Sequence, residues 1–108
     1  LQPDVMWCGG LTELLRISAM AAAYDIPVVP HGSGAYSYHF VITQPHCPFC
    51  EYLNSSPECL DFPLVFVNMF ENVVASVNGM SKLNDEPGFG MKLNRKDLKM
   101  SRIFPSKE

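Results

Sequence analysis

The chain has 108 residues, of which 47% are apolar and 18% charged, and its formal net charge is −3. This apolar content is sufficient for a small folded core, and a charge so near zero gives no reason to expect a nucleic-acid or membrane partner. No apolar run reaches the roughly 18 residues of a membrane helix, and no signal-peptide pattern opens the sequence, so we expect a cytoplasmic protein.

The first predicted elements are a short strand and a helix. Residues 1–4 are the end of a strand that delivers Asp4. A helix is predicted over residues 11–24, because leucines and alanines recur there at helical spacing. Pro27 follows, and the residue before a proline is disfavoured in the helical conformation, so the helix ends before it.

The same order then repeats. A short buried strand is predicted over residues 28–29, and it leads to His31. A second strand is predicted over residues 49–53, which include Phe49 and Cys50 and carry Glu51. Residues 35–43 are rich in aromatic and β-branched side chains, which is typical of a strand. Their position between two strands favours a helix, and that is the prediction we make.

The remainder is expected to be less regular. Residues 54–63 are predicted as loop, and residues 64–91 as an irregular return segment with one or two short strands and a turn at 85–90. Six of the eight basic residues fall within the last 17 positions. A solvated, flexible tail over 95–108 is favoured over a phosphate-binding arm.

Strand, helix and strand in this order predict an α/β fold with a parallel sheet. A closed (β/α)8 barrel needs about 250 residues, so at most its last three strands fit here. The sequence has no initiator Met, and we expect the C-terminal part of a longer protein. Residues 1–63 would be barrel, 64–94 a return segment and 95–108 the tail. A small self-contained α/β domain is the alternative.

Three polar residues lie where the predicted strands end: Asp4, His31 and Glu51. Such positions are usually catalytic in barrels. Neighbouring strands stand about 4.8 Å apart, so Asp4 can hydrogen-bond one imidazole nitrogen and leave the other to move a proton. A purely structural Asp–His pair is the alternative. Gly32 and Ser33 follow the histidine, and their backbone is a candidate for binding a substrate carboxylate or hydroxyl.

The cysteines offer a different hypothesis. Cys47 and Cys50 form a C-x-x-C motif, which is a thiol-redox centre in some folds. The long helix that should follow is broken by Pro57. His46 and Cys59 could complete a zinc site, although their spacing is poor for tetrahedral geometry. Structural thiols are the favoured interpretation, and His46, like His39, is expected to be structural.

Five segments together resemble a known family. They are Gln2–Asp4, Trp7–Glu13, Pro27–Ser33, Tyr36–Phe40 and Pro87–Gly90. They are similar, in this order, to the C-terminal part of the L-rhamnonate dehydratase family, in the mandelate racemase branch of the enolase superfamily. The resemblance implies a (β/α)7β barrel with a separate capping domain.

The resemblance also implies roles. His31 would be the general base that removes the proton α to a sugar-acid carboxylate, with Asp4 as its dyad partner. Glu51 would hydrogen-bond the substrate or its enediolate. Mg²⁺ would be bound by carboxylates on strands outside this chain, so no metal ligand is assigned here. A homo-oligomer is expected at full length. Other acid-sugar dehydratases, racemases and an inactive, degenerate copy stay open.

Overall fold

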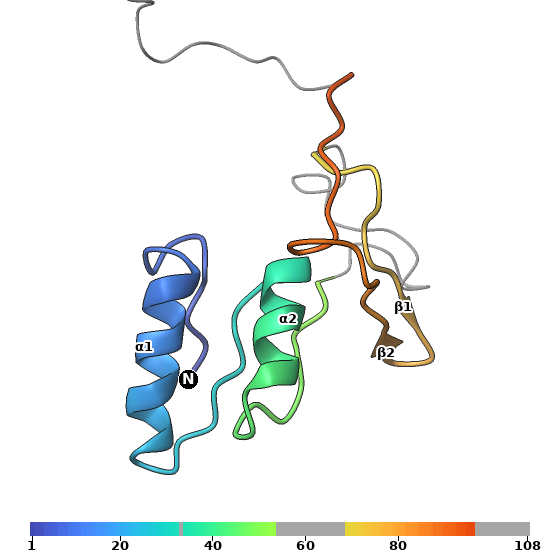
Figure 1. Ribbon diagram of the computed structural model, residues 1–108. Helices are drawn as coiled ribbons and strands as arrows, with labels where there is room; N and C mark the ends of the chain where they lie inside the picture. Colours follow the sequence, from blue (N-terminus) through green and yellow to red (C-terminus); the bar gives the residue numbers. More distant parts are fainter. Residues whose placement is uncertain (33, 54–68, 97–108) are drawn as a thin grey trace, which may run out of the picture.

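The computed structural model describes residues 1–32, 34–53 and 69–96. Figure 1 shows their regular elements, which are the helices α1 (Leu11–Ala22) and α2 (Ala35–Thr43) and the strands β1 (Ser76–Val77) and β2 (Met80–Ser81). The predicted loop over 54–63 and most of the predicted tail lie outside the described residues. The division into 1–63, 64–94 and 95–108 therefore stays a prediction.

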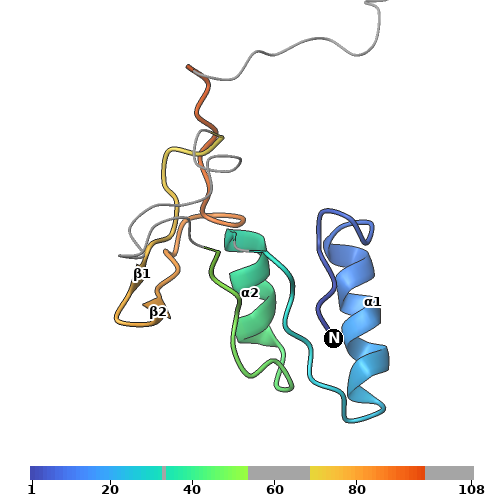
Figure 2. The ribbon, with the colours of Figure 1, turned by 180° about the vertical axis from the view of Figure 1, so that it is seen from behind.

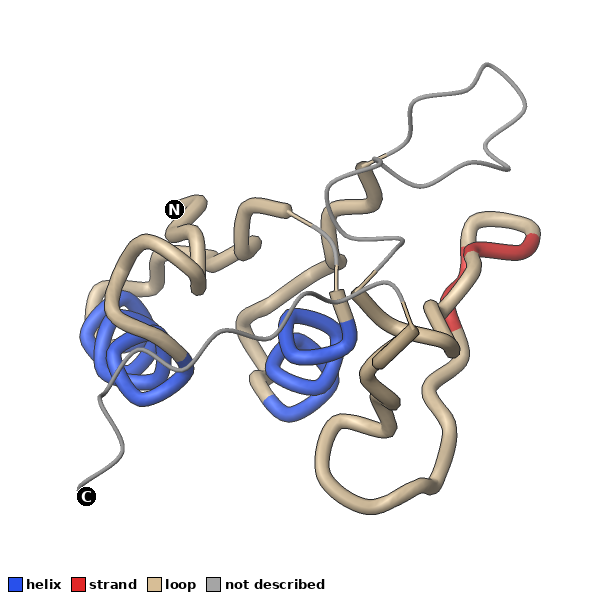
Figure 3. The backbone as a smooth tube through the Cα atoms, turned by 90° about the horizontal axis from the view of Figure 1, so that it is seen from above, coloured by secondary structure: helices blue, strands red, loops and turns tan. Residues whose placement is uncertain are grey.

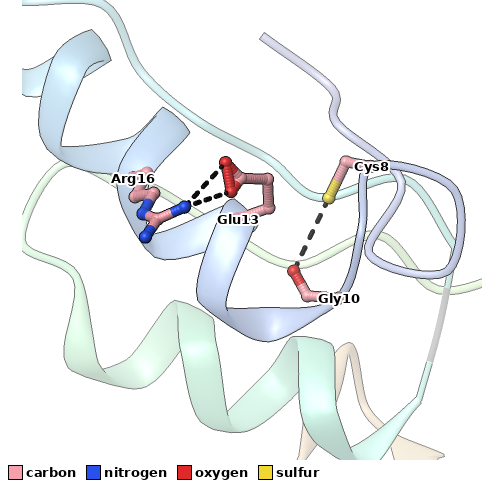
Figure 4. A network of polar contacts seen from close by, with 4 residues as sticks. All are labelled: Cys8, Gly10, Glu13 and Arg16. Carbon is pink, nitrogen blue, oxygen red and sulfur yellow. Dashed lines mark hydrogen bonds and ion pairs between the residues drawn. The ribbon is translucent and has the colours of Figure 1, made fainter.

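Helix α1 begins where predicted and ends two residues earlier than predicted. Its first turn carries Glu13, whose negative charge interacts favourably with the positive end of the helix dipole. Glu13 also forms a 3.0 Å ion pair with Arg16 (Figure 4). At the other end, Asp25 adopts the left-handed conformation at φ 53°. The amide of Ile26 donates to the carbonyl of Ala21 at 3.0 Å, which closes a Schellman motif and stops the helix.

The segments 1–4 and 27–31 pair in parallel, as predicted. Leu1 donates to the carbonyl of Pro27 at 2.8 Å, Val29 donates to Leu1 at 2.9 Å, and His31 donates to Pro3 at 3.0 Å. Asp4 and His31 form a parallel bridge at the end of this ladder. The strand predictions are therefore right in direction and in pairing.

The same segments do not become regular strands, and prolines explain why. Pro3 has no N–H and so removes one hydrogen bond from this short ladder. Pro30 lies between the donors Val29 and His31, so it removes a donor on the opposite side, where Val28 donates to His46. Residues 49–53 likewise form no regular strand. The prediction of strands at 28–29 and 49–53 is wrong in this respect.

Helix α2 spans the nine residues predicted for it, so the alternative of a strand there is wrong. Figures 1 and 2 show α1 and α2 on either side of the extended segment 27–31, and Figure 1 shows both helices descending while that segment rises. Seen from above, the two helix axes lie side by side (Figure 3). This is the geometry of a βα repeat.

The core lies between these elements. Its fully buried apolar members are Val5, Leu14, Ala21, Val28 and Phe40. Burial of large aliphatic and aromatic side chains of this kind stabilises a fold by about 1.5–3 kcal/mol each.

Among the described residues, no helix is both long enough and apolar enough to cross a membrane.

Ser18 makes a polar connection across this core. Its side chain is fully buried on α1, and its hydroxyl donates to Oε1 of Gln44 at 3.1 Å. A hydroxyl has one proton, so the 3.0 Å contact with Nε2 of His46 requires the histidine to donate. His46 therefore has the structural role predicted for it.

The return segment is built on short pairings. β1 and β2 form a hairpin whose two-residue loop, Asn78–Gly79, has positive φ at both positions, as a type I′ turn requires. Residues 69–72 pair with 92–94, and Asn72 accepts from the amide of Lys92 at 2.7 Å. The predicted turn over 85–90 is present, with the amide of Gly90 donating to Pro87. The predicted short strands and turn are therefore present in the described part of residues 64–91.

Candidate active site

Asp4, His31 and Glu51 meet at one end of the paired segments, as their positions after predicted strands indicated. The backbones of Asp4 and His31 form the parallel bridge described above. Nδ1 of His31 lies 2.8 Å from Oε2 of Glu51, which comes from the segment that follows α2. The sequence prediction that these three residues lie together is confirmed by this geometry, while their catalytic roles stay predictions.

The partner of the histidine differs from the one expected. Among the described residues, no hydrogen bond joins the carboxylate of Asp4 to the ring of His31. Instead Oδ1 of Asp4 accepts from the amide of Met6 at 2.8 Å. Its carbonyl accepts from the amides of Trp7 at 3.1 Å and Cys8 at 2.8 Å. Asp4 is therefore occupied in organising the turn that follows it, and Glu51 holds His31.

Glu51 connects the histidine to the following loop. The same Oε2 that contacts His31 also accepts a short hydrogen bond from the amide of Gly32. Because a carboxylate oxygen only accepts, Nδ1 of His31 is the protonated nitrogen. In the neutral form of the ring, Nε2 is then the nitrogen without a proton, and the side chain is half exposed. This is the arrangement of a proton-transfer histidine with an orienting carboxylate.

Glycines shape the loop between His31 and α2. Gly32 has φ 84°, a conformation that side chains with a Cβ rarely adopt, and it presents its amide to Glu51. At Gly34, an added Cβ would lie 2.9 Å from the ring of Tyr36, so this position admits only glycine without moving that ring. Ser33, the second predicted substrate-binding residue, lies outside the described residues.

The site opens onto a hollow of about 170 Å³. Its lining includes the predicted residues Asp4, His31 and Gly32, and also Met6, Trp7, Tyr36 and Leu53. Burial, and then the negative charge of Asp4, raise the pKa of Tyr36, so its phenol stays protonated as a potential donor. Sequence reasoning missed Trp7 and Tyr36 as site residues. Their position in the sequence could have indicated them, because Trp7 follows Asp4 by three residues and Tyr36 follows His31 by five.

The cysteine motif lacks the features of a redox centre. Cys47 and Cys50 follow the C-terminal end of α2, whereas a helix N-terminus is what lowers a thiol pKa. Burial raises the pKa of both thiols instead. In residues 1–32, 34–53 and 69–96 no group of three or more His, Cys, Asp or Glu side chains is arranged to hold a metal ion. Cys59, the fourth ligand considered for zinc, lies outside these ranges.

Alkylation kinetics test this interpretation of the thiols. The rate at which iodoacetamide labels Cys47 and Cys50 rises with pH. We expect the midpoint pH of this rise to be higher in the folded chain than in the chain unfolded in guanidinium chloride. The reason is that only the thiolate reacts and burial raises the pKa. Peptide mapping by mass spectrometry separates the cysteines. A lower midpoint in the folded chain would restore the redox hypothesis.

His39 is also structural in its contacts. Its Nδ1 lies 2.6 Å from the carbonyl of Ala35, one turn earlier in α2. Its ring meets that of Phe89 edge to face, with centroids 5.6 Å apart. His39 thus joins α2 to the turn of the return segment and takes no part in lining the hollow.

Known proteins are similar to this chain in sequence and in structure. Residues 1–97 match the family described as enolase C-terminal domain-like. The chain is 48% identical over 94 residues to an L-rhamnonate dehydratase from Saccharopolyspora erythraea, covering 87% of this chain and 24% of that protein.

Two solved structures are similar as well. The crystal structure of L-rhamnonate dehydratase from Gibberella zeae has a TM-score of 0.75 at 52% identity, over 88% of this chain and 25% of that one. A structure of rhamnonate dehydratase from the same organism, complexed with Mg, has a TM-score of 0.69 at 52% identity, over 88% of this chain and 24% of that one. The chain thus spans about a quarter of the length of these relatives.

Proposed function

The chain belongs to the enolase C-terminal domain-like family, which confirms the predicted α/β fold and superfamily, and from this premise we propose an acid-sugar dehydratase function. The proposed substrate is L-rhamnonate and the product 2-keto-3-deoxy-L-rhamnonate. The observation that carries the proposal is the 2.8 Å contact of Glu51 with Nδ1 of His31, which leaves Nε2 available on a residue that lines the hollow. The names of the similar proteins support the choice of substrate.

The proposed reaction uses His31 twice. Nε2 removes the proton on the carbon next to the substrate carboxylate, and the electron pair of that C–H bond forms the enediolate. The imidazolium then gives the proton to the neighbouring hydroxyl, which leaves as water. The enol that results becomes the 2-keto acid. In sum, L-rhamnonate gives the keto acid and one water, and His31 returns to its starting state.

Other residues would serve this histidine and the substrate. Glu51 would stabilise the imidazolium that forms between the two proton transfers, because its carboxylate contacts Nδ1. Asp4, the predicted dyad partner, would act by holding the turn that forms one wall of the hollow. Gly32 and Ser33 are proposed to bind the substrate through their backbone.

Mg²⁺ is the proposed cofactor, since a similar rhamnonate dehydratase was crystallised with Mg. The described residues do not fit a magnesium site by themselves, because Asp4 and Glu51 are occupied by backbone amides and by His31. We therefore propose that the metal ligands lie outside this chain. When bound there, the metal would supply Lewis-acid stabilisation of the enediolate.

Assembly and location are proposed on other grounds. Several large apolar side chains are exposed on the described surface, among them Met20, Tyr24 and Ile42. A homo-oligomer of the complete protein is proposed, in which the remainder of the protein and a second copy would together cover such surface. The free thiols of Cys8, Cys47 and Cys50 suit a reducing compartment, which supports a cytoplasmic location. A small-molecule sugar acid is the proposed partner, with no nucleic acid or membrane.

The function is tested with the polypeptide of the complete reading frame. In buffer containing Mg²⁺, it is offered a panel of sugar acids, and 2-keto acid is measured. We expect L-rhamnonate to be dehydrated, with kcat/KM in the range of roughly 10⁴–10⁸ M⁻¹s⁻¹ usual for enzymes. Failure to dehydrate any acid of the panel would contradict the proposal. Racemisation without loss of water would point instead to a racemase with the same histidine.

A further inference from the structure

Tyr36, the second residue of α2, lines the same hollow as His31 and Gly32. We propose that its hydroxyl donates a hydrogen bond to the substrate hydroxyl that leaves as water, on the carbon next to the one that loses its proton. Tyr36 would then be a catalytic residue for the second step of the reaction and not for the first. The inference rests on the proposed function, in which His31 takes part in both steps.

The first argument is that the ring of Tyr36 lies back over the loop that follows His31. A Cβ added at Gly34 would come within 2.9 Å of Cζ and 3.2 Å of the hydroxyl oxygen, so the phenol end lies against the Gly34 backbone. Side chains on a helix are directed toward its N-terminus, and α2 begins directly after this loop. The hydroxyl of Tyr36 is therefore held at the loop between His31 and the helix.

The second argument is that this hydroxyl is an available donor. No described residue forms a hydrogen bond with its oxygen. Burial, and then the negative charge of Asp4, raise the pKa of Tyr36, so the phenol keeps its proton at neutral pH. A phenol that keeps its proton can donate a hydrogen bond to the substrate, but it cannot replace His31 as the base.

The chemistry of the reaction selects the oxygen that this donor would serve. The substrate carboxylate and the enediolate are assigned to Mg²⁺, whose ligands are proposed to lie outside this chain. The hydroxyl that leaves takes its proton from Nε2 of His31, so it must come close to that ring. Because Tyr36 borders the same hollow, a hydrogen bond from its phenol would orient this hydroxyl toward Nε2.

The proposed step is balanced without any change in Tyr36. The imidazolium of His31 gives its Nε2 proton to the substrate hydroxyl, and the C–O bond breaks with its electron pair going to oxygen. The electron pair of the enediolate forms the new carbon–carbon double bond, and water leaves. Tyr36 keeps its own proton throughout, and its hydrogen bond passes from the substrate hydroxyl to the departing water.

Two acids separate the second step from the first. L-Rhamnonate is compared with its 3-deoxy analogue, which keeps the reacting carbon but has no hydroxyl to lose. In D₂O, exchange of the α-proton of this analogue, followed by NMR, measures proton removal alone. With the polypeptide of the complete reading frame and Mg²⁺, we expect Tyr36→Phe to lower kcat/KM for dehydration by about 10-fold, which is near the upper value for one hydrogen bond between neutral groups. Exchange of the analogue should stay within about twofold.

Two further variants keep this test interpretable. Tyr24→Phe makes the same substitution beyond the end of α1, outside the hollow, and should change neither rate. Gly34→Ala keeps the phenol but forces its ring to move, because the extended backbone at φ 169° accepts alanine while the added Cβ meets the ring. We expect it to slow dehydration as Tyr36→Phe does, and to add little when the two are combined. Unchanged dehydration in Tyr36→Phe, or equal losses with both acids, would overturn the proposal.

Binding separates this inference from the proposed function. If the complete protein dehydrates no acid, the proposed function fails, and calorimetry is used to measure the Kd of L-rhamnonate and of its 3-deoxy analogue. A Kd for L-rhamnonate that rises several-fold in Tyr36→Phe, with an unchanged Kd for the analogue, would still support the hydrogen bond. Absence of binding, equal changes in the two Kd values, or no change in either would overturn it.

Discussion

His31→Asn is expected to lower kcat/KM for dehydration by about 10⁴-fold or more. General acid–base catalysis by one positioned side chain contributes roughly 10²–10⁴-fold, and this ring is proposed to move a proton in two successive steps. Asparagine approximates the shape of the imidazole near Cβ but cannot take up a proton at neutral pH. The measurement is the rate of 2-keto acid formation by the complete protein, with circular dichroism to confirm that the variant is folded.

A second histidine provides the control. His39→Asn makes the same substitution on α2, outside the hollow, and an asparagine amide can still donate toward the carbonyl of Ala35. We expect that variant to retain activity within several-fold. Equal losses in the two variants would mean that His31 acts through stability. A fully active His31→Asn would remove it from the reaction.

The helices could be predicted from the sequence because their local signals agree with their packing. The periodicity of residues 11–22 places Leu14, Ser18 and Ala21 on the buried face. The second helix shows the opposite case. Its composition favours a strand, and the burial of Ala35, Tyr38 and Phe40, the last in the core that also holds Val28, overrides that preference. Its place in the βα order was the better guide.

The short strands could not be predicted at this level. Apolar content and position identify the segment around Val28, and they give its parallel pairing correctly. Whether a regular ladder forms depends on each N–H group, and Pro3 and Pro30 remove two of them. The hairpin of β1 and β2 was the reverse case. Asn-Gly is a strong hairpin signal, and Asn78–Gly79 would have located it within residues 64–91.

The site shows the same division between position and contact. The strand-end rule predicts that Asp4, His31 and Glu51 converge, and they do. It cannot predict which carboxylate reaches the imidazole, because that depends on competing donors. The amide of Met6 lies two residues beyond Asp4 and captures its carboxylate locally. Glu51 comes from a separate segment and contacts the ring.

Glu51→Gln is expected to lower kcat by about 10²–10⁴-fold with little change in KM. The carboxylate contacts Nδ1 of His31 at 2.8 Å and stabilises the ring when it is protonated. An amide oxygen has only a partial charge, so it supports the imidazolium less well, and its NH₂ group can turn toward the ring and select the wrong tautomer. In the serine-protease triad, the equivalent loss of charge costs about 10⁴-fold. Steady-state kinetics of the complete protein give both constants.

The division between kcat and KM decides what Glu51 does. If Glu51 acts on His31, the Glu51→Gln variant has a lower kcat and an unchanged KM, because the substrate makes the same contacts in both proteins. If it binds the substrate carboxylate, as the family resemblance implied, KM rises as well and the contact with His31 would belong only to the protein without substrate. Glu13→Gln removes a carboxylate from the surface pair with Arg16 and should change neither constant. If KM rises in the Glu51 variant and not in the Glu13 variant, Glu51 binds the substrate. Asp4, whose backbone lies beside His31, would then be the residue that orients the histidine.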